Sequence, residues 1–296
     1  MTIYTTQQLR ELGTTKTRQN KAVADGRLIK LKAGIYSTTG SLADIASLYP
    51  EGAVTGLNAL ALHDLTEESR PVLLRVPHTR TPLANSHIRL IRSEAPSGSI
   101  NDIRTVNVAQ ALSDALSHEK LENPGNLLLN HYTGIRGGER LEADLAQLKR
   151  PSAIRELAFK AGVGTASKWE RTMLLHLRKA GLEPVPNFKL EAYYWDLAFP
   201  AARVVIDWDS LHYHLPHNNN DTFYIGLWKS IQAVQLGWAP LKFTDTCTNY
   251  HFELVRDVIK ETVAHRTTLR PHSPVPGTLK SPAWQFHEGI SFDTSF

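Results

Sequence analysis

Two strand-like runs joined by a very short turn constrain this chain most. They read FKLEAYYWDLAFP and ARVVIDWDSLHYH, and the turn between them is residues 200–202. A turn of this length predicts that the runs pair as neighbouring antiparallel strands. Both runs are rich in Val, Ile, Trp and Phe, which predicts a buried sheet, yet they carry acids at Asp196, Asp207 and Asp209.

The acids in these runs need a partner, because a carboxylate on a buried strand costs several kcal/mol unless a counter-charge or a metal holds it. Pairing would bring Asp196 and Asp207 together, and hard oxygen donors favour Mg²⁺. We therefore predict a Mg²⁺ site that activates water against a phosphodiester, with His212 or His214 as a ligand or proton carrier. The structural alternative is that the strand face shared by Asp207 and Asp209 is turned to solvent.

The segments around the two runs predict the rest of a small domain. Ser167 is expected to cap a helix over SKWERTMLLHLRKAGL, with Glu170 as its capping-box partner and Gly181 at its end. A later helix carries Lys229, which is placed to hold a phosphate. The strand APLKFT and the helix FELVRDVIKETV complete the order α-β-β-α-β-α. Glu170 taken alone is explained by capping.

The N-terminal segment predicts a separate module. Thr6 is expected to cap a helix that Gly13 ends, and Thr14 or Thr15 to cap a second helix that runs to Asp25. RLIKL and GIYS then predict a small hairpin. Helix, turn, helix and hairpin is the order of a winged helix-turn-helix.

Basic and amide side chains gather in this N-terminal segment. Between residues 14 and 34, six basic residues stand against one acid. Cations neutralise DNA phosphates, and Arg and Gln can reach base edges in the major groove. The predicted DNA contacts are Lys16, Arg18, Gln19, Lys21, Arg27, Lys30 and Lys32. The plain alternative is a solvated amphipathic helix without a ligand.

Composition excludes several other classes. Apolar residues make up 42% and charged residues 21% of the chain, as in globular proteins that live in water. We find no apolar run near the ~20 residues that span a bilayer and no signal-peptide core, so we expect a cytoplasmic protein without a membrane partner. Cys247 is expected to be a buried or half-buried thiol without a catalytic role, and His63 and His131 to be structural.

The C-terminal motifs occur together in a known nuclease family. SKWERTMLLHLRKAGL, YYWDLAFPAARVVIDWDSLHYH and LWKSIQAVQLGWAPLKFT, within residues 166–263, resemble the Vsr-like branch of the PD-(D/E)xK superfamily. This resemblance implies a restriction-endonuclease-like domain that cuts DNA with Mg²⁺. The positions that it makes functional are Glu170, Asp196, Asp207, Asp209 and His214, with Lys229 and Lys242 where Arg is common.

Two residues depart from that family pattern. Asp207 stands where Glu is usual, and Ser210 stands where Gly is usual. Asp reaches about one methylene less than Glu, which affects where a metal is held, but it keeps the charge. We therefore expect metal binding to be retained, while catalysis is the more sensitive property.

The whole chain is also similar to bacterial proteins that begin with an AbiEi-type antitoxin-like winged helix. ADGRLIKLKAGIYST and AVTGLNALALHDL carry this likeness. It implies a connecting module before the nuclease-like domain, and a repressor that counters a nucleotidyltransferase toxin. The expected domains are 1–38, 39–165 and 166–265, followed by a Pro- and Ser-rich tail over 266–296 whose aromatic residues suit packing against the body.

The sequence thus predicts an α+β protein with two rival functions. In the first, it binds DNA and hydrolyses it with Mg²⁺. Asp196 and Asp207 hold the metal, Glu170 and Asp209 support it, and Lys229 steadies the phosphate. In the second, it is a non-catalytic repressor or antitoxin whose nuclease-like fold binds DNA or a protein partner such as a toxin.

Overall fold

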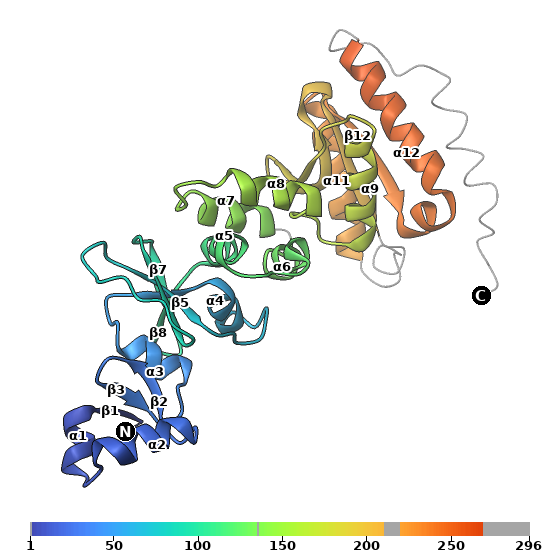
Figure 1. Cartoon of the computed structure of the whole chain (residues 1–296). Coiled ribbons are helices and arrows are strands. Elements are labelled where there is room, and N and C mark those ends of the chain that lie inside the picture. Colours follow the sequence, from blue (N-terminus) through green and yellow to red (C-terminus); the bar gives the residue numbers. More distant parts are fainter. Residues whose placement is uncertain (1, 135, 210–219, 269–296) are drawn as a thin grey trace, which may run out of the picture. The chain divides into compact units, whose positions relative to one another are not determined.

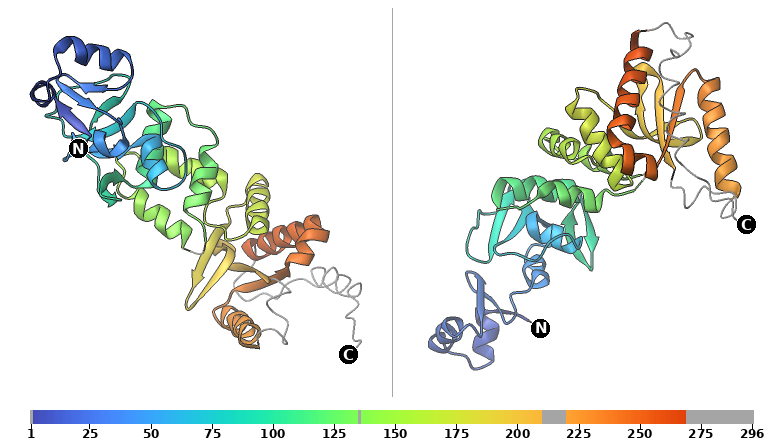
Figure 2. Two further views of the ribbon diagram at one scale, coloured as in Figure 1. Left: turned by 90° about the horizontal axis from the view of Figure 1, so that it is seen from below. Right: turned by 90° about the vertical axis from the view of Figure 1, so that its right-hand side faces the viewer.

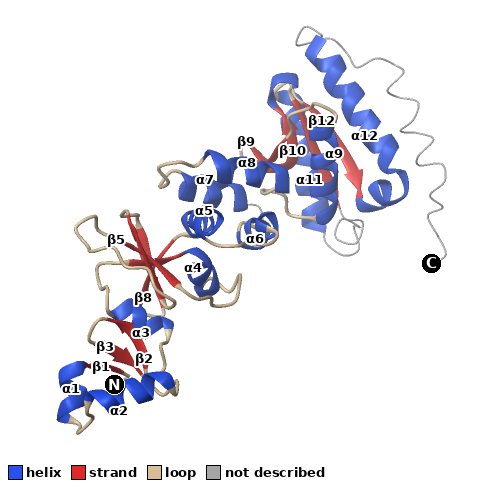
Figure 3. Cartoon of the chain, in the orientation of Figure 1, coloured by secondary structure: helices blue, strands red, loops and turns tan. Residues whose placement is uncertain are grey.

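The structure is a computed structural model that describes residues 2–134, 136–209 and 220–268, with the backbone alone at 209 and 220–224. Its contacts divide the chain into two compact units. The first unit is Met1–His131 with Arg140–Ala161, and the second is Tyr132–Glu139 with Gly162–Phe296. Helices and strands occur in both units (Figures 1, 2 and 3), which confirms the prediction of a chain that mixes both.

The first unit begins with two helices and a small sheet. β1 (Ile3–Thr5) leads into α1 (Thr6–Glu11) and α2 (Lys16–Ala24), and β2 (Ile29–Lys32) and β3 (Ile35–Ser37) form a hairpin. The sheet has the order β1-β3-β2. The predicted pair of helices and the hairpin are confirmed, and β1 is added before them.

Side-chain caps explain where these two helices begin. The Thr5 hydroxyl accepts from Gln8 N at 3.1 Å, and Gln8 Oε1 accepts from Thr5 N at 2.8 Å, which is a complete capping box. The prediction that Thr6 is the cap is wrong by one residue, because Thr5 is the residue with extended backbone. Thr15 caps α2 by accepting from Arg18 N.

A five-stranded sheet in the order β6-β5-β4-β8-β7 forms the centre of the first unit. Its strands are β4 (Ala53–Thr55), β5 (Val72–Val76), β6 (Ile88–Arg92), β7 (Ser97–Ile100) and β8 (Ile103–Val106). β4 and β5 are antiparallel, and β5 and β6 are parallel. β7 and β8 form a hairpin whose turn places Asn101 and Asp102 at positive φ.

Helices α3, α4 and α5 contact this sheet, and α6 contacts α8. The helices of this part of the chain are α3 (Leu42–Ser47), α4 (Gly56–Leu62), α5 (Val108–His118), α6 (Pro124–His131), α7 (Gly137–Leu145) and α8 (Ser152–Ala161). Asn107 caps α5 by accepting from Gln110 N at 2.8 Å. The apolar face of α5 buries Val108, Leu112 and Ala115 completely.

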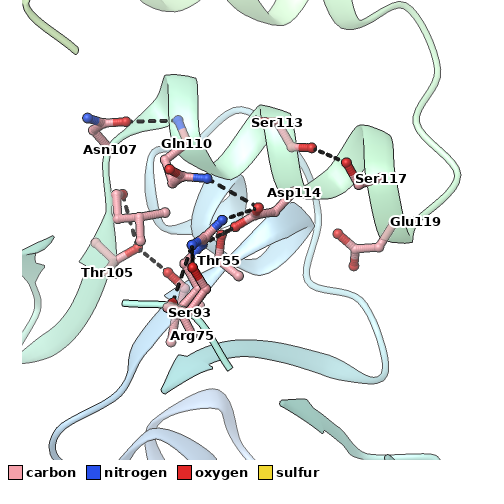
Figure 4. Close-up of polar contacts among 12 residues, drawn as sticks. Thr55, Arg75, Ser93, Thr105, Asn107, Gln110, Ser113, Asp114, Ser117 and Glu119 are labelled. Atoms are coloured by element: carbon pink, nitrogen blue, oxygen red, sulfur yellow. Dashed lines mark hydrogen bonds and ion pairs between the residues drawn. The ribbon is translucent and has the colours of Figure 1, made fainter. Parts of the chain in front are cut away.

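A buried ion pair joins β5 to α5 (Figure 4). Arg75 Nε and Nη2 donate to the two carboxylate oxygens of Asp114 at 2.6 and 2.7 Å. Thr55 Oγ1 and Gln110 Nε2 donate to the same carboxylate at 2.5 and 3.2 Å. Ser93 Oγ accepts from Arg75 Nη1 at 3.1 Å. The charge of Asp114 is therefore balanced and hydrogen-bonded inside the unit.

The second unit carries a four-stranded sheet in the order β12-β11-β10-β9. Its elements are α9 (Lys168–Lys179), β9 (Val185–Leu190), β10 (Tyr193–Phe199), a 3-10 turn (Pro200–Ala202), β11 (Val204–Asp209), α11 (Asn220–Gln235), β12 (Ala239–Thr244) and α12 (Asp245–Thr268). The order is thus α-β-β-β-α-β-α. The predicted single run from 188 to 200 is wrong, because Glu191 at positive φ turns the chain back between two strands.

The strand register determines which side chains meet in this sheet. β10 and β11 are antiparallel, with Leu197 opposite Ile206, as the short turn predicts. β11 and β12 are parallel, with Asp207 opposite Lys242. Asp207 and Lys242 therefore lie side by side on neighbouring strands.

Two apolar layers cover the faces of this sheet. Leu197, Phe199, Val204 and Ile206 pack with α9 and α12, for example against Met173. The opposite layer joins Ala198 and Val205 to Ala233 of α11, together with Trp195. The alternation along 197–199 and 204–206 thus places α9 and α12 on one face of the sheet and α11 on the other.

No helix in the described ranges is long and apolar enough to cross a membrane. Cys247, at the start of α12, is buried, as predicted. Its Sγ accepts a hydrogen bond from Thr244 Oγ1 at 3.1 Å. This thiol is therefore part of the core beneath the sheet.

Candidate functional site

Asp207 of β11 is buried between two lysines. Lys229 Nζ of α11 lies 2.5 Å from Asp207 Oδ1, and Lys242 Nζ of β12 lies 3.2 Å from Asp207 Oδ2. Only 7% of Asp207 is exposed, so water screens these contacts little. Each carboxylate oxygen therefore has its own ammonium group.

Lys229 is held in place by an aromatic ring as well. Its Nζ lies 4.5 Å from the centre of the Trp195 ring, a cation–π arrangement. Gly226 lies one turn before Lys229 on α11 and close to Lys242. A Cβ atom at Gly226 would lie 3.1 Å from Lys242 Nζ, so the absence of a side chain leaves room for this lysine. Trp195 was not predicted as a site residue, although it stands directly before the predicted site residue Asp196.

Asp196 of β10 lies across from Asp207, one position beyond the Leu197–Ile206 pair. Its Oδ2 accepts from Trp208 N at 2.6 Å. Burial, and then the charges of Glu170 and Asp207, raise the pKa of Asp196 to about 8. A carboxyl group with that pKa is mostly protonated at neutral pH when no cation is near.

Glu170 of α9 is buried, with 5% of the residue exposed. Ser167 caps α9 by accepting from Glu170 N at 3.1 Å, as predicted. The Glu170 carboxylate, however, accepts from Ala166 N at 2.8 Å and not from Ser167 N, so the reciprocal half of the predicted capping box is displaced by one residue. Because its charge also raises the pKa of Asp196, Glu170 belongs electrostatically to the acidic cluster.

The structure thus brings together five of the predicted site residues, which we call the acidic cluster: Glu170, Asp196, Asp207, Lys229 and Lys242. The side chain of Asp209, and Ser210, His212 and His214 entirely, lie outside the described residues. Among the residues that are described, no three His, Cys, Asp or Glu side chains are arranged as ligands of one metal ion.

The predicted DNA-contacting residues occupy α2 and the β2–β3 hairpin of the first unit. Lys16, Arg18 and Lys21 are exposed on α2, and Lys30 is exposed on β2. Arg27 is exposed but paired with Asp25 at 2.9 Å. Lys32 is half-buried, with its Nζ 4.9 Å from the centre of the Tyr49 ring. Of these six cations, Arg27 alone forms an ion pair within the part of the chain that the structure describes.

Gln19 does not belong to this exposed surface. Only 2% of the residue is exposed, and its Nε2 donates to Thr14 O at 3.1 Å. Its amide therefore ties α2 to the preceding loop, and the prediction that it contacts DNA is not compatible with this arrangement. Helical spacing explains why Gln19 is buried while its neighbours on α2 are exposed. Gln19 and the buried Ala22 are three residues apart and therefore lie on the same face of the helix.

The two histidines expected to be structural come together. The rings of His63 and His131 lie 5.4 Å apart, edge to face, and burial lowers the pKa of His131, with a smaller contribution from His63. His63 Nε2 lies 3.4 Å from Val106 O.

The Arg75–Asp114 network was not predicted, although a lone Arg within the apolar run VLLRV indicated a buried charge. Arg75 and Asp114 line one side of an open polar cavity of about 380 Å³.

A search of protein-family models found none that matches the chain, and a search of curated proteins found no relative.

Proposed function

We propose that this protein binds DNA through its first unit and hydrolyses DNA phosphodiesters at the acidic cluster of its second unit with Mg²⁺. The observation that carries the proposal is that Asp196 and Asp207 lie across from each other on neighbouring strands. Burial and the charges of Glu170 and Asp207 raise the pKa of Asp196 to about 8, so the site disfavours another negative charge. A divalent cation would relieve this repulsion, and an ordinary structural carboxylate has no need of such surroundings.

The residues present fit Mg²⁺ by their chemistry, since carboxylate oxygens are the donors that it prefers. Asp196 and Asp207 would hold the ion, which when bound lowers the pKa of water and neutralises charge on a phosphoryl group. Glu170 supports the site by its charge. Lys229 and Lys242 place two ammonium groups beside the acids, where they attract and orient a phosphate. Asp209, His212 and His214 keep their predicted roles as supporting acid and proton carriers.

The proposal includes two fold assignments. The helix-helix-hairpin order of residues 3–37 supports a winged helix-turn-helix, because it offers α2 to a DNA groove. A helix with a buried Glu before a sheet whose neighbouring strands carry Asp supports a restriction-endonuclease-like domain. The added strand β9 lies at the edge of that sheet, away from β11, and leaves this pattern intact.

A nicking assay on supercoiled plasmid tests the catalytic half. Mg²⁺-dependent nicking should fall to background in Asp196→Asn and in Glu170→Gln, because each replaces a carboxyl group that can ionise beside Mg²⁺ by a neutral amide of the same size. Glu183→Gln is the matched control, since Glu183 is an exposed acid of the same unit. Equal nicking by all four proteins would assign the activity to a contaminant and refute the proposal.

Salt-dependent DNA binding tests the other half. Replacing Lys16, Arg18 and Lys21 together by Ala should weaken binding and reduce the slope of log K against log salt by up to roughly 0.9 per lost phosphate contact. Replacing Lys149, Arg150 and Lys160 by Ala is the control, because it removes the same charge from other exposed positions of the first unit. Equal losses from both triple variants would show that only total charge matters.

One observation favours a second candidate, a non-catalytic repressor or antitoxin. Both oxygens of Asp207 already have ammonium partners, so this carboxylate is neutralised without a metal. In that case purified protein shifts DNA but never cuts it, and calorimetry detects no Mg²⁺ binding at millimolar concentration. A toxin or other protein would then be the partner of the second unit.

A further inference from the structure

Helix α11 carries an exposed apolar surface that the proposed function does not use. Leu227, Trp228, Ile231 and Val234 are between 44% and 62% exposed, and we call these four residues the α11 outer face. Leu227, Ile231 and Val234 follow one another at helical spacing, so they form a stripe, and Trp228 widens it. Contiguous exposed apolar patches mark interaction sites on protein surfaces, whereas single scattered apolar residues do not.

The outer face lies opposite the side of α11 that meets the sheet. Lys229 and Ala233, four residues apart, point inward to Asp207 and to Val205. At 100° per residue, the stripe of Leu227, Ile231 and Val234 is turned roughly half a revolution from them. Whatever covers the outer face therefore presses α11, and Lys229 with it, onto the sheet.

The described chain ends beside this helix. Arg266, in the last turn of α12, donates from Nη2 to Gly237 O at 2.7 Å, and Gly237 comes directly after α11 and its cap. The C-terminal end of α12 is therefore next to the C-terminal end of α11. The segment 269–296, which lies outside the described residues, starts from this point.

The composition of that segment suits the outer face. It carries Trp284, Phe286, Ile290 and Phe292, and its two basic residues balance its two acids. The Pro-rich stretch 269–283 can extend about 45 Å at ~3.1 Å per residue. The outer face from Leu227 to Val234 is only about 10 Å long at 1.5 Å per residue. The aromatic residues can therefore reach the whole face from the end of α12.

We propose that Trp284 and Phe286 of the chain's own C-terminal segment pack on the α11 outer face and clamp α11 to the sheet. The two residues alternate with polar Gln285 and His287, so in an extended strand they share one side. This inference does not depend on DNA binding or catalysis, and its test uses neither. A clamp of this kind would stabilise the Lys229–Asp207 contact from the far side of the helix.

Hydroxyl-radical footprinting of Trp228 in the full-length protein tests the clamp. Oxidation of Trp228 should rise several-fold in the double variant Trp284→Ser/Phe286→Ser. The control Gln285→Ser/His287→Ser changes the alternating positions of the same segment and should leave Trp228 as protected as in the unaltered protein. Conversely, Ile231→Ser/Val234→Ser should expose Trp284 to oxidation, a second readout that leaves the buried core untouched.

Three results would overturn the clamp. The first is that Trp228 of the unaltered protein is as reactive as an exposed tryptophan, which would mean that nothing covers it. The second is that Trp228 is protected equally in both double variants, which would assign its cover to another part of the chain. The third is that Trp228 becomes exposed only on dilution, as a dimer dissociates in analytical ultracentrifugation, which would mean that a second copy covers α11.

Discussion

Lys229 Nζ lies 2.5 Å from Asp207 Oδ1, and this contact joins α11 to β11 from the side of the sheet opposite α9 and α12. The two side chains are 12% and 10% exposed, so the pair is largely removed from water. Lys242 completes the neutralisation of Asp207 from β12. Among the side chains of α11 that the structure describes, Ala233 is the buried apolar one, so the Lys229–Asp207 contact and the cover of the outer face contribute strongly to how firmly this part of the helix is held.

Lys229→Met should lower the free energy of unfolding by about 2–4 kcal/mol, because it leaves a buried carboxylate with one cation in place of two. Lys242→Met should cost less, since Lys242 is 29% exposed and water can replace it. Urea denaturation of both variants measures the difference. If Lys229→Met unfolds at the same urea concentration as the parent protein, the ion pair contributes nothing net. Mg²⁺ should stabilise Lys229→Met more than the parent if it binds the freed oxygen.

The raised pKa of Asp196 predicts a pH dependence of stability in metal-free buffer. Between about pH 4 and pH 8 the folded chain keeps a proton on Asp196 that the unfolded chain has lost. Stability from this group therefore falls as the pH rises through that window and levels off above it. The melting temperature of the parent protein should fall relative to that of Asp196→Asn between pH 5 and pH 8 in EDTA. Parallel curves for the two proteins would contradict the raised pKa.

Asp114→Ala should destabilise the first unit by about 3–5 kcal/mol, because Arg75 would be left buried without its counter-charge. Thr55 and Gln110 would also lose their acceptor. Thermal unfolding measures the change. Glu142→Ala is the control, since Glu142 forms an exposed pair with Arg155 and its loss should change stability little. Similar losses from both variants would mean that burial of the Arg75–Asp114 pair is energetically unimportant.

Gly56→Ala should destabilise the first unit by more than the ~1–2 kcal/mol that a left-handed backbone costs an L-residue. Gly56 has φ +63, and an added Cβ would collide with the Glu119 carboxylate, which accepts from Leu57 N at 2.7 Å. The variant thus strains the backbone and displaces the acid at the start of α4. Gly98→Ala is the control, because nothing lies within 4 Å of its missing Cβ. A Gly56→Ala protein as stable as the Gly98→Ala protein would contradict this account.

Local sequence determined many of the elements. Ser167 and Thr15 stand before helical runs and cap them, because a side-chain oxygen can reach a free N–H only two or three residues ahead. The alternation in β10 and β11 and the short turn between them determined their antiparallel pairing. These features depend on neighbours a few residues apart, and so they can be predicted from one segment at a time.

Other features escaped prediction because their causes lie far along the chain. The burial of Gln19 depends on the Leu9, Ala22, Leu28 and Tyr36 core that α2 packs against. The turn at Glu191 is stabilised by β9 pairing with β10, and no Gly or Pro marks it. Arg75 and Asp114 are 39 residues apart and pair only when α5 crosses β5.

For the acidic cluster, the sequence by itself determined which charges are available: Glu170, Asp196, Asp207, Lys229 and Lys242 were all identified from their motifs. Only the tertiary structure decided how they are distributed. The parallel register of β11 and β12 gives one oxygen of Asp207 to Lys242, and α11 gives the other to Lys229. Asp196 is left among acids with a raised pKa. The physical reason is that charge interactions depend on distance and burial, which the fold sets and the order of residues does not.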